Sequence, residues 1–400
     1  MLSSAMVVAF RDAADVGVVI PDVNRMGLFD TISDGDQPSD FHCLDLVGGF
    51  STSQIAAIAY TRFKKRMGLN RHPVAVLNVG WPGTSSEKFL PDGASFNFVN
   101  DGGVAQTINA VSHPAAGDYL WTRNIVVRQS IADFIATEWV NRTTRYSFLS
   151  YIQGPFEDGG ATYGFMGEYR AQQDLLPIPG QNGARNILWE QNAGTSNDPD
   201  QALGSHAQMA YCQDNTSGRD WLIGPRYPHK LRDSIHHSAF GVVGFAERTG
   251  QAAAYIEMYG EWQPLWIENV AFSGAVCTLT TNRPRQCVGD LVIDTVNMDA
   301  QPQFGFTLWN NVADVETPCT VVVNGNTVTL TAASALSGQI EVGYTARGAV
   351  NLAGTELLPQ WSATIGNIRM TGRDAPAIIP TTVQPTLDHW LCRYRKNFTV

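Results

Sequence analysis

Between residues 50 and 260 the chain repeats one order of segments, in which an apolar, strand-like run is followed by a segment with helical periodicity. The segment STSQIAAIAYTRFKKRMG opens on Ser and Thr, which cap helices, and closes on basic residues and Gly68, which end them. The run HPVAVLNVGWPG then reads as a buried strand that enters a glycine turn. This repeated order predicts an α/β fold with parallel strands, right-handed crossovers and helices on both faces of the sheet.

The composition changes after GEWQPLW, near residue 266. Short stretches rich in Val, Thr and Ile recur between Gly, Asn and Pro, among them AVCTLTT, DLVIDTV and CTVVVNGNTVTLT. The NGN flanked by alternating residues is a strong hairpin signal. We predict three parts: an α/β domain over 1–265, a β-rich accessory domain resembling a β-sandwich over 266–380, and a C-terminal tail over 381–400.

Charge and composition exclude several classes of partner. The net charge is -10, and basic residues cluster only at 64–66, which argues against binding to a nucleic-acid backbone. No run of about 18 apolar residues appears, so we predict no transmembrane segment, and the first fifteen residues make no convincing secretion signal. The six cysteines lack metal-ligand spacing, so no zinc site is expected. Cys277 and Cys287 could bond across a hairpin, but we favour two free thiols.

The turns that follow the strands are the informative ones, because ligands of an open parallel sheet bind beyond the carboxyl ends of its strands. These turns are VGWPGTS at 79–85, IQGPFEDGG at 152–160, WEQNAGTSND at 189–198 and IGPRYPHKLRDSIHHS at 223–238. The last turn holds Asp233 three residues before His236. His236 could take the proton of a serine nucleophile while Asp233 fixes its tautomer.

A developing oxyanion needs preorganised donors, which backbone N–H groups near Gly80 or Gly83 and the side-chain amide of Gln153 could supply. Each of these features also has a purely structural interpretation. Asp233 could cap a helix, Gln153 could satisfy backbone groups at a strand end, and the glycines could serve only the geometry of their turn. His237, beside His236, is interpreted as a solvated or packing histidine.

This ordered set resembles the SGNH or GDSL-like hydrolases, especially carbohydrate esterases similar to sialate and acetylxylan O-acetylesterases and their relatives in phage tail proteins. The family's glycine turn matches VGWPGTS, its amide block matches YIQGPFEDGG and its Asp-x-x-His block matches DSIH. The resemblance implies a flavodoxin-like parallel sheet sandwiched by helices, followed by a β-sandwich-like domain. It also implies a serine esterase without metal or organic cofactor, whose substrate contacts we expect from Trp81, Thr84 and Tyr227.

The nucleophile block departs from the family pattern. No Gly-Gln-Ser, Gly-Asp-Ser or G-x-S-x-G stands near the start of the chain. The chain could begin after the nucleophile, which we favour; Ser3 or Ser4 could substitute for it; or the protein could bind a glycan without cleaving it. A second departure is Pro155, where the family usually has Glu.

We therefore expect a hydrolase that removes O-acetyl groups from carbohydrate through an acyl-enzyme. The alternative is a catalytically degenerate glycan-binding or structural virion protein with the same fold, marked by exposed Trp81, Trp189 and Tyr227. A nucleotide-binding enzyme is disfavoured because no GxGxxG or P-loop opens a helix. The expected partner is an acetylated carbohydrate or polysaccharide, with no nucleic acid and no membrane. We expect a homo-oligomer or virion component in an extracellular or virion-associated location.

Overall fold

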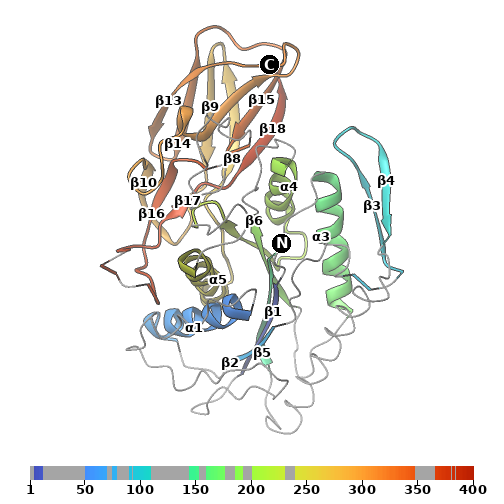
Figure 1. The fold of residues 1–400 in the computed structure, drawn as a ribbon, viewed down its shortest axis with the longest axis vertical. Helices are drawn as coiled ribbons and strands as arrows, with labels where there is room; N and C mark the ends of the chain where they lie inside the picture. Colours follow the sequence, from blue (N-terminus) through green and yellow to red (C-terminus); the bar gives the residue numbers. More distant parts are fainter. Residues whose placement is uncertain are drawn as a thin grey trace.

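In the computed structural model, the main chain forms four α-helices and five β-sheets within the described residues (Figure 1). The described residues are 4–11, 50–69, 74–78, 90–91, 93–109, 144–152, 159–175, 185–191, 201–229, 239–346, 365–379, 381–382 and 384–400. The helices are α1 (Phe50–Arg66), α3 (Gly159–Asp174), α4 (Gln201–Asp214) and α5 (Ala239–Tyr259).

The largest sheet has five strands in the order β2-β1-β5-β6-β7. Its strands are β1 (Ser4–Arg11), β2 (Val74–Asn78), β5 (Thr144–Ile152), β6 (Asn186–Gln191) and β7 (Asp220–Pro225). On one face Leu188 and Ile223 pack with the apolar residues of α1 and α5. On the other face the Trp189 ring contacts Tyr169 of α3 and Tyr211 of α4. Helices therefore cover both faces of this sheet (Figure 1).

The predicted flavodoxin-like parallel sheet of the SGNH type is wrong. Strands β5, β6 and β7 are parallel, but β1 lies between β2 and β5 and runs antiparallel to both. The other four sheets of the described residues are antiparallel throughout. An apolar run has the same composition whichever way it lies in a sheet, so the pattern could not predict the reversed strand at residues 4–11.

Local sequence explains how α1 ends and why it packs closely on α5. The amide of Leu69 donates to the carbonyl of Lys64 and that of Gly68 to the carbonyl of Lys65, which is the Schellman pattern with Gly68 at φ +74°. On α5, a Cβ added at Gly250 would lie 2.5 Å from the carbonyl oxygen of Ala56 in α1. Glycine at position 250 therefore allows the two helix backbones to approach each other.

Residues 267–400 contribute three antiparallel sheets, ordered β12-β11-β15-β18, β13-β14-β9-β8 and β10-β16-β17. Their strands are β8 (Ile267–Ser273), β9 (Val276–Thr281), β10 (Cys287–Ile293), β11 (Phe306–Asn310), β12 (Val315–Glu316), β13 (Cys319–Asn324), β14 (Thr327–Ala332), β15 (Gln339–Tyr344), β16 (Ile368–Gly372), β17 (His389–Trp390) and β18 (Tyr394–Thr399). A short 3-10 helix, Pro302–Gly305, precedes β11. Alternate residues of the two four-stranded sheets, such as Leu279, Leu330 and Val342, point into one shared core.

Two further features complete the fold. A hairpin of β3 (Ser95–Val99) and β4 (Ala105–Asn109) lies beside α3 (Figure 1). It packs on this helix through Phe96, whose ring contacts Phe165. Residues of β6 and α4 share their core cluster with the C-terminal sheets. The Gln191 side chain joins the two regions, since it accepts from the amide of Arg393 (2.6 Å) and donates to the carbonyl of the same residue (2.9 Å).

Candidate functional site at the carboxyl edge of the five-stranded sheet

The reversed direction of β1 brings its first residue, Ser4, to the edge where the other four strands of the sheet end. Ser4, the first residue of β1, lies opposite Ile152, the last residue of β5. Met6 lies opposite Asn78, the last residue of β2. Strands β6 and β7 run in the direction of β5 and end at the same edge. Since opposed residues of an antiparallel pair have Cα atoms about 4.5–5.5 Å apart, the backbone of Ser4 lies at this carboxyl edge.

Most of the residues predicted for the site are in segments that leave these strands. Gln153 directly follows Ile152, and Gly80 is the second residue after Asn78. The predicted residues that lie outside the described residues are Ser3, Gly80, Trp81, Gly83, Thr84, Gln153, Asp233 and His236. Their roles stay predictions.

Tyr227 is the one predicted substrate contact whose side chain the structure describes. The side chain is fully buried, and its hydroxyl donates to the carbonyl of Leu391 (2.9 Å) and lies 3.3 Å from the Tyr344 hydroxyl. Trp189 is also buried, and its indole N–H donates to Asp220 (2.8 Å). Neither ring is exposed as a sugar platform in this structure, and the role of Tyr227 in substrate binding stays a prediction.

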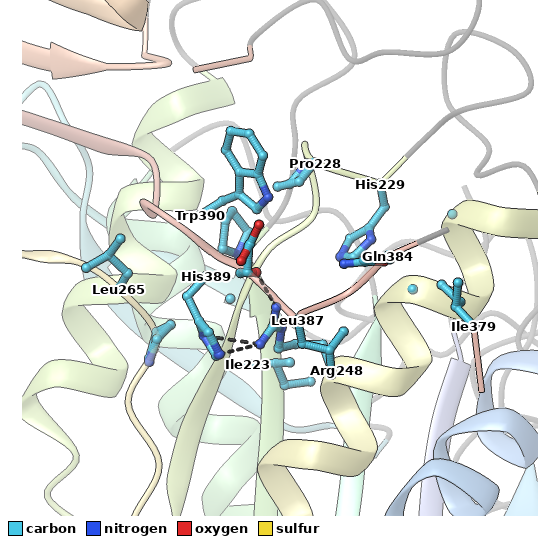
Figure 2. A pocket seen from close by; sticks show the side chains of 16 residues that line it. Ile223, Pro228, His229, Arg248, Leu265, Ile379, Gln384, Leu387, His389 and Trp390 are labelled. Carbon is cyan, nitrogen blue, oxygen red and sulfur yellow. Dashed lines mark hydrogen bonds between the residues drawn. The ribbon is translucent and has the colours of Figure 1, made fainter. Parts of the chain in front are cut away.

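A cavity of about 180 Å³ lies beside the carboxyl end of β7 (Figure 2). Residues from β7, from the first half of α5 and from the segment 384–390 line it. His229, just after β7, and Gly241, in the first turn of α5, both belong to its wall. The chain between these two residues includes Asp233 and His236. The residues on either side of the segment that carries the predicted base therefore both line this cavity.

A polar network centred on Arg248 forms part of the cavity wall (Figure 2). One guanidinium nitrogen of Arg248, Nη1, donates to Oε1 of Gln251 (2.7 Å) and lies 2.6 Å from Nε2 of His389. The other, Nη2, donates to the backbone carbonyl of Asp388. Arginine only donates, so the His389 ring acts as the acceptor.

Both histidines of the cavity wall are neutral near pH 7. Burial, together with the positive charges of Arg248 and Arg226, lowers the pKa of His229 to about 3. Burial also lowers the pKa of His389 well below its ordinary value, with Arg248 adding to the effect. Gly244 allows α5 to approach the first of these rings, because a Cβ added there would lie 2.9 Å from Nδ1 of His229.

A buried carboxyl group lies near the same edge, on β6. Glu190 is fully buried, and one of its oxygens accepts from Nη1 of Arg226 at 3.0 Å. Its second oxygen has no hydrogen-bond partner in the described part of the chain. Burial raises the pKa of Glu190 to about 8, although the charge of Arg226 opposes this shift.

Sequence reasoning did not identify Arg248, Glu190 or the cavity wall formed by residues 384–390. Glu190 stands inside WEQNAGTSND, one of the turns that the sequence places after a strand. Arg248 lies within a mostly apolar helical segment, SAFGVVGFAERTGQAAAYIEMYG, where it is the one basic residue, and that was the available signal. Residues 381–400, predicted as a tail, include β17 and β18, which pair with β16 and β15.

The described residues show no metal site and no membrane span. No three of their His, Cys, Asp or Glu side chains gather in a way that could hold a metal ion. None of the helices described combines the length and apolar character needed to cross a bilayer. Cys277 and Cys287, which the sequence left open as a disulfide, are both free thiols.

Comparison with known proteins gives weak likenesses. No family model matches the chain, and no curated protein matches it. Among solved structures, a carbohydrate acetylesterase from Xanthomonas citri matches at TM-score 0.33 and 15% identity, over 60% of this chain and 44% of that one. The N-terminal part of the bacterial S-layer protein SbsC matches at TM-score 0.17 and 16% identity, over 37% of this chain and 29% of that one. A thioester domain from Enterococcus faecium matches at TM-score 0.10 and 14% identity, over 36% of this chain and 47% of that one.

The chain thus spans less than half the length of each of these three structures. Their low TM-scores carry no argument about the activity of this protein. The resemblance to the SGNH hydrolases accordingly stays a resemblance of motifs.

Proposed function

We propose that this protein is a serine ester hydrolase that removes acyl groups, in particular O-acetyl groups, from carbohydrate. In this proposal Ser4 is the nucleophile, His236 is the general base and Asp233 orients the base. Gln153 and backbone amides near Gly80 stabilise the oxyanion.

The register of β1 is the observation that carries the proposal. The sequence pattern predicts a base, an orienting carboxylate and oxyanion donors after strands β7, β5 and β2, but it lacks a nucleophile block. Ser4 lies opposite Ile152, the last residue of β5. Gln153 is the next residue of the chain after Ile152. A serine at the edge where the other predicted groups follow their strands supplies the missing chemical group.

The proposed reaction proceeds in two steps. The Ser4 hydroxyl attacks the acyl carbonyl while His236 accepts its proton, and the resulting oxyanion is held by the amide donors. His236 then returns the proton to the sugar oxygen, which leaves as an alcohol. Water attacks the acyl-enzyme with His236 again as base, which releases the carboxylic acid and regenerates the serine.

The test is the turnover of p-nitrophenyl acetate and of an acetylated xylan by the wild type and four variants. Ser4→Ala and His236→Ala should each lower kcat by about 10³-fold or more, since nucleophile and base act as a unit. Ser3→Ala and His237→Ala are the matched neighbours and should keep most of the activity. All variants are first compared by circular dichroism.

Different outcomes contradict different parts of the proposal. Equal losses in His236→Ala and His237→Ala would overturn the assignment of the base. Loss in Ser3→Ala with an active Ser4→Ala would transfer the nucleophile to Ser3. A folded wild type that binds acetylated xylan without releasing acetate would favour the glycan-binding alternative.

A further inference from the structure

We propose that the cavity beside β7 is a binding site for a small carboxylate, which is held by the guanidinium group of Arg248. The inference does not depend on ester hydrolysis. It rests on the charge, the burial and the partners of the described residues in the cavity wall.

Arg248 is a buried cation with no ion-pair partner in the described part of the chain. Its side chain is 8% exposed and forms part of the cavity wall. The groups that accept its hydrogen bonds are the Gln251 side chain, the His389 ring and the backbone carbonyl of Asp388, all of which are neutral. Buried charges in proteins are normally paired, so the Arg248 guanidinium lacks a direct counter-charge that a bound anion would supply.

The charge on Arg248 persists at neutral pH. Burial lowers the pKa of its guanidinium to about 10, which is still well above 7. The two histidines of the wall are neutral in the same range and add no charge of their own. Arg248 is therefore the cation that stays charged among these three wall residues, and the Asp388 carboxylate, which also lines the cavity, is paired with Arg369.

The acidic groups near Arg248 are each bound by other donors. The Asp388 carboxylate accepts from Nη1 of Arg369 (3.2 Å) and from the hydroxyl of Thr386 (2.8 Å). Asp374 accepts from Gln251 and from the hydroxyl of Tyr255, both at 2.7 Å.

Glu247, the residue before Arg248, accepts from the backbone amide of Ile378. These carboxylates reduce the positive potential at Arg248 without forming an ion pair with it. A ligand carboxylate inside the cavity would be the first anion in direct contact with the guanidinium.

Helix α5 adds to the preference for an anion. Gly241 and Gly244 lie in its first two turns and line the cavity. The N-terminal end of a helix carries partial positive charge. The electrostatic effect of the helix and the charge of Arg248 therefore act in the same direction.

The size of the cavity limits the ligand. At about 30 Å³ per water molecule, about 180 Å³ corresponds to roughly six waters. This volume fits a carboxylate together with the few carbons attached to it, and it is below the range of about 300–1,000 Å³ that is typical of drug-sized ligands. Pro228, Gln384 and Trp390 are partly exposed in the wall, so a larger sugar could extend outward from an anchored carboxylate.

The experiment is a calorimetric titration of the wild-type chain with galacturonate, galactose and acetate. Galacturonate should bind and galactose should not, because only the former carries a carboxylate. Acetate that binds as tightly as galacturonate would support the site and identify a simple carboxylic acid as its ligand, whereas weaker binding of acetate would support a carboxylated sugar. Equal binding of galactose and galacturonate, or binding of neither carboxylate, would overturn the proposal.

The matched variants are Arg248→Gln and Arg285→Gln. Arg285 is an exposed arginine that pairs with Glu261, so its replacement should leave carboxylate affinity unchanged. Loss of the Arg248 charge should weaken binding by about 10-fold to 100-fold, which is the range for a hydrogen bond to a charged group. A folded Arg248→Gln variant with wild-type affinity would contradict the inference.

A second measurement uses only the wild type, in case Arg248→Gln fails to fold. The imidazole resonances of His229 and His389 are followed by NMR during the galacturonate titration. Both should shift and saturate with the calorimetric dissociation constant, and unchanged signals would overturn the proposal. Because binding is measured without turnover, failure here leaves the proposed hydrolysis intact, and an inactive protein that still binds carboxylate leaves this site intact.

Discussion

Because burial raises the pKa of Glu190, the free energy of unfolding should depend on pH. Its folded-state pKa of about 8 lies above the ordinary value of 4.5, so the folded protein keeps a proton that the unfolded chain releases as the pH rises. This contribution to the free energy of unfolding is fully present below pH 4.5 and is lost as the pH rises through 8.

Urea unfolding of the wild type and of Glu190→Gln at pH 5, 6.5 and 8 measures this effect. Relative to Glu190→Gln, which cannot ionise, the wild type should lose stability on the order of a few kcal/mol across the series, since each pKa unit is worth about 1.4 kcal/mol. Glu261→Gln, at an exposed ion pair, is the control for the substitution itself. Parallel pH profiles for the wild type and Glu190→Gln would show that Glu190 ionises normally in the folded state.

The variant Tyr227→Phe tests whether Tyr227 supports the fold or contacts the substrate. Tyr227→Phe removes the hydroxyl that donates to the carbonyl of Leu391 and leaves a buried acceptor, which should cost about 1–3 kcal/mol of stability. Tyr259→Phe, at a partly exposed ring, should change stability by less than about 0.5 kcal/mol. Denaturant unfolding and ester turnover are measured together on both variants. A loss of turnover at unchanged stability would instead support the substrate contact that the sequence predicts.

A local motif can suggest only residues that are close in the chain. Asp233 and His236 stand three positions apart in one turn, so their pairing follows from the sequence alone and stays a prediction. Arg248 and His389 lie 141 positions apart and meet only because the segment 384–390 returns to α5. No local pattern contains such a contact, which is why the cavity was not foreseen.

Gly250 shows how one residue determines the packing of two helices. A Cβ added there would lie 2.5 Å from the carbonyl oxygen of Ala56, so Gly250→Ala forces α5 away from α1. We expect a loss of about 1–3 kcal/mol, as for other overpacked sites, despite the higher helix propensity of Ala.

The matched control is Gly167→Ala in α3, where the nearest atom to an added Cβ is an ordinary 3.9 Å away in Tyr211. That variant should be neutral or more stable by up to about 1 kcal/mol. Thermal unfolding of the two variants gives the comparison. Equal stabilisation by both substitutions would contradict the close packing of α1 on α5.

The elements differ in how far sequence could predict them. Helix α1 follows from local signals, because its basic last turn and Gly68 lie within the segment itself. The reversed β1 does not, because the direction of a strand depends on which neighbours it finds in the sheet. Residues 4–11 carry an apolar run, yet nothing in that run specifies insertion between β2 and β5.

At the scale of the whole molecule, the C-terminal sheets and the five-stranded sheet share one hydrophobic cluster. Arg393, fully buried, donates to the carbonyl of Thr345 (3.1 Å) and to the hydroxyl of Ser205 in α4 (3.1 Å). The segment 384–390 also forms part of the cavity wall. The C-terminal region therefore helps to build the candidate site rather than lying apart from it.

The most direct test of the central claim is covalent labelling with a phosphonate that reacts with activated serines. Trypsin cleaves after Arg11, so the N-terminal peptide contains Ser3 and Ser4, and fragmentation by mass spectrometry distinguishes them. We predict label on Ser4 in the wild type and its loss in His236→Ala but not in His237→Ala. Label on a serine elsewhere, or label on Ser4 that persists in His236→Ala, would contradict a Ser4 nucleophile activated by His236.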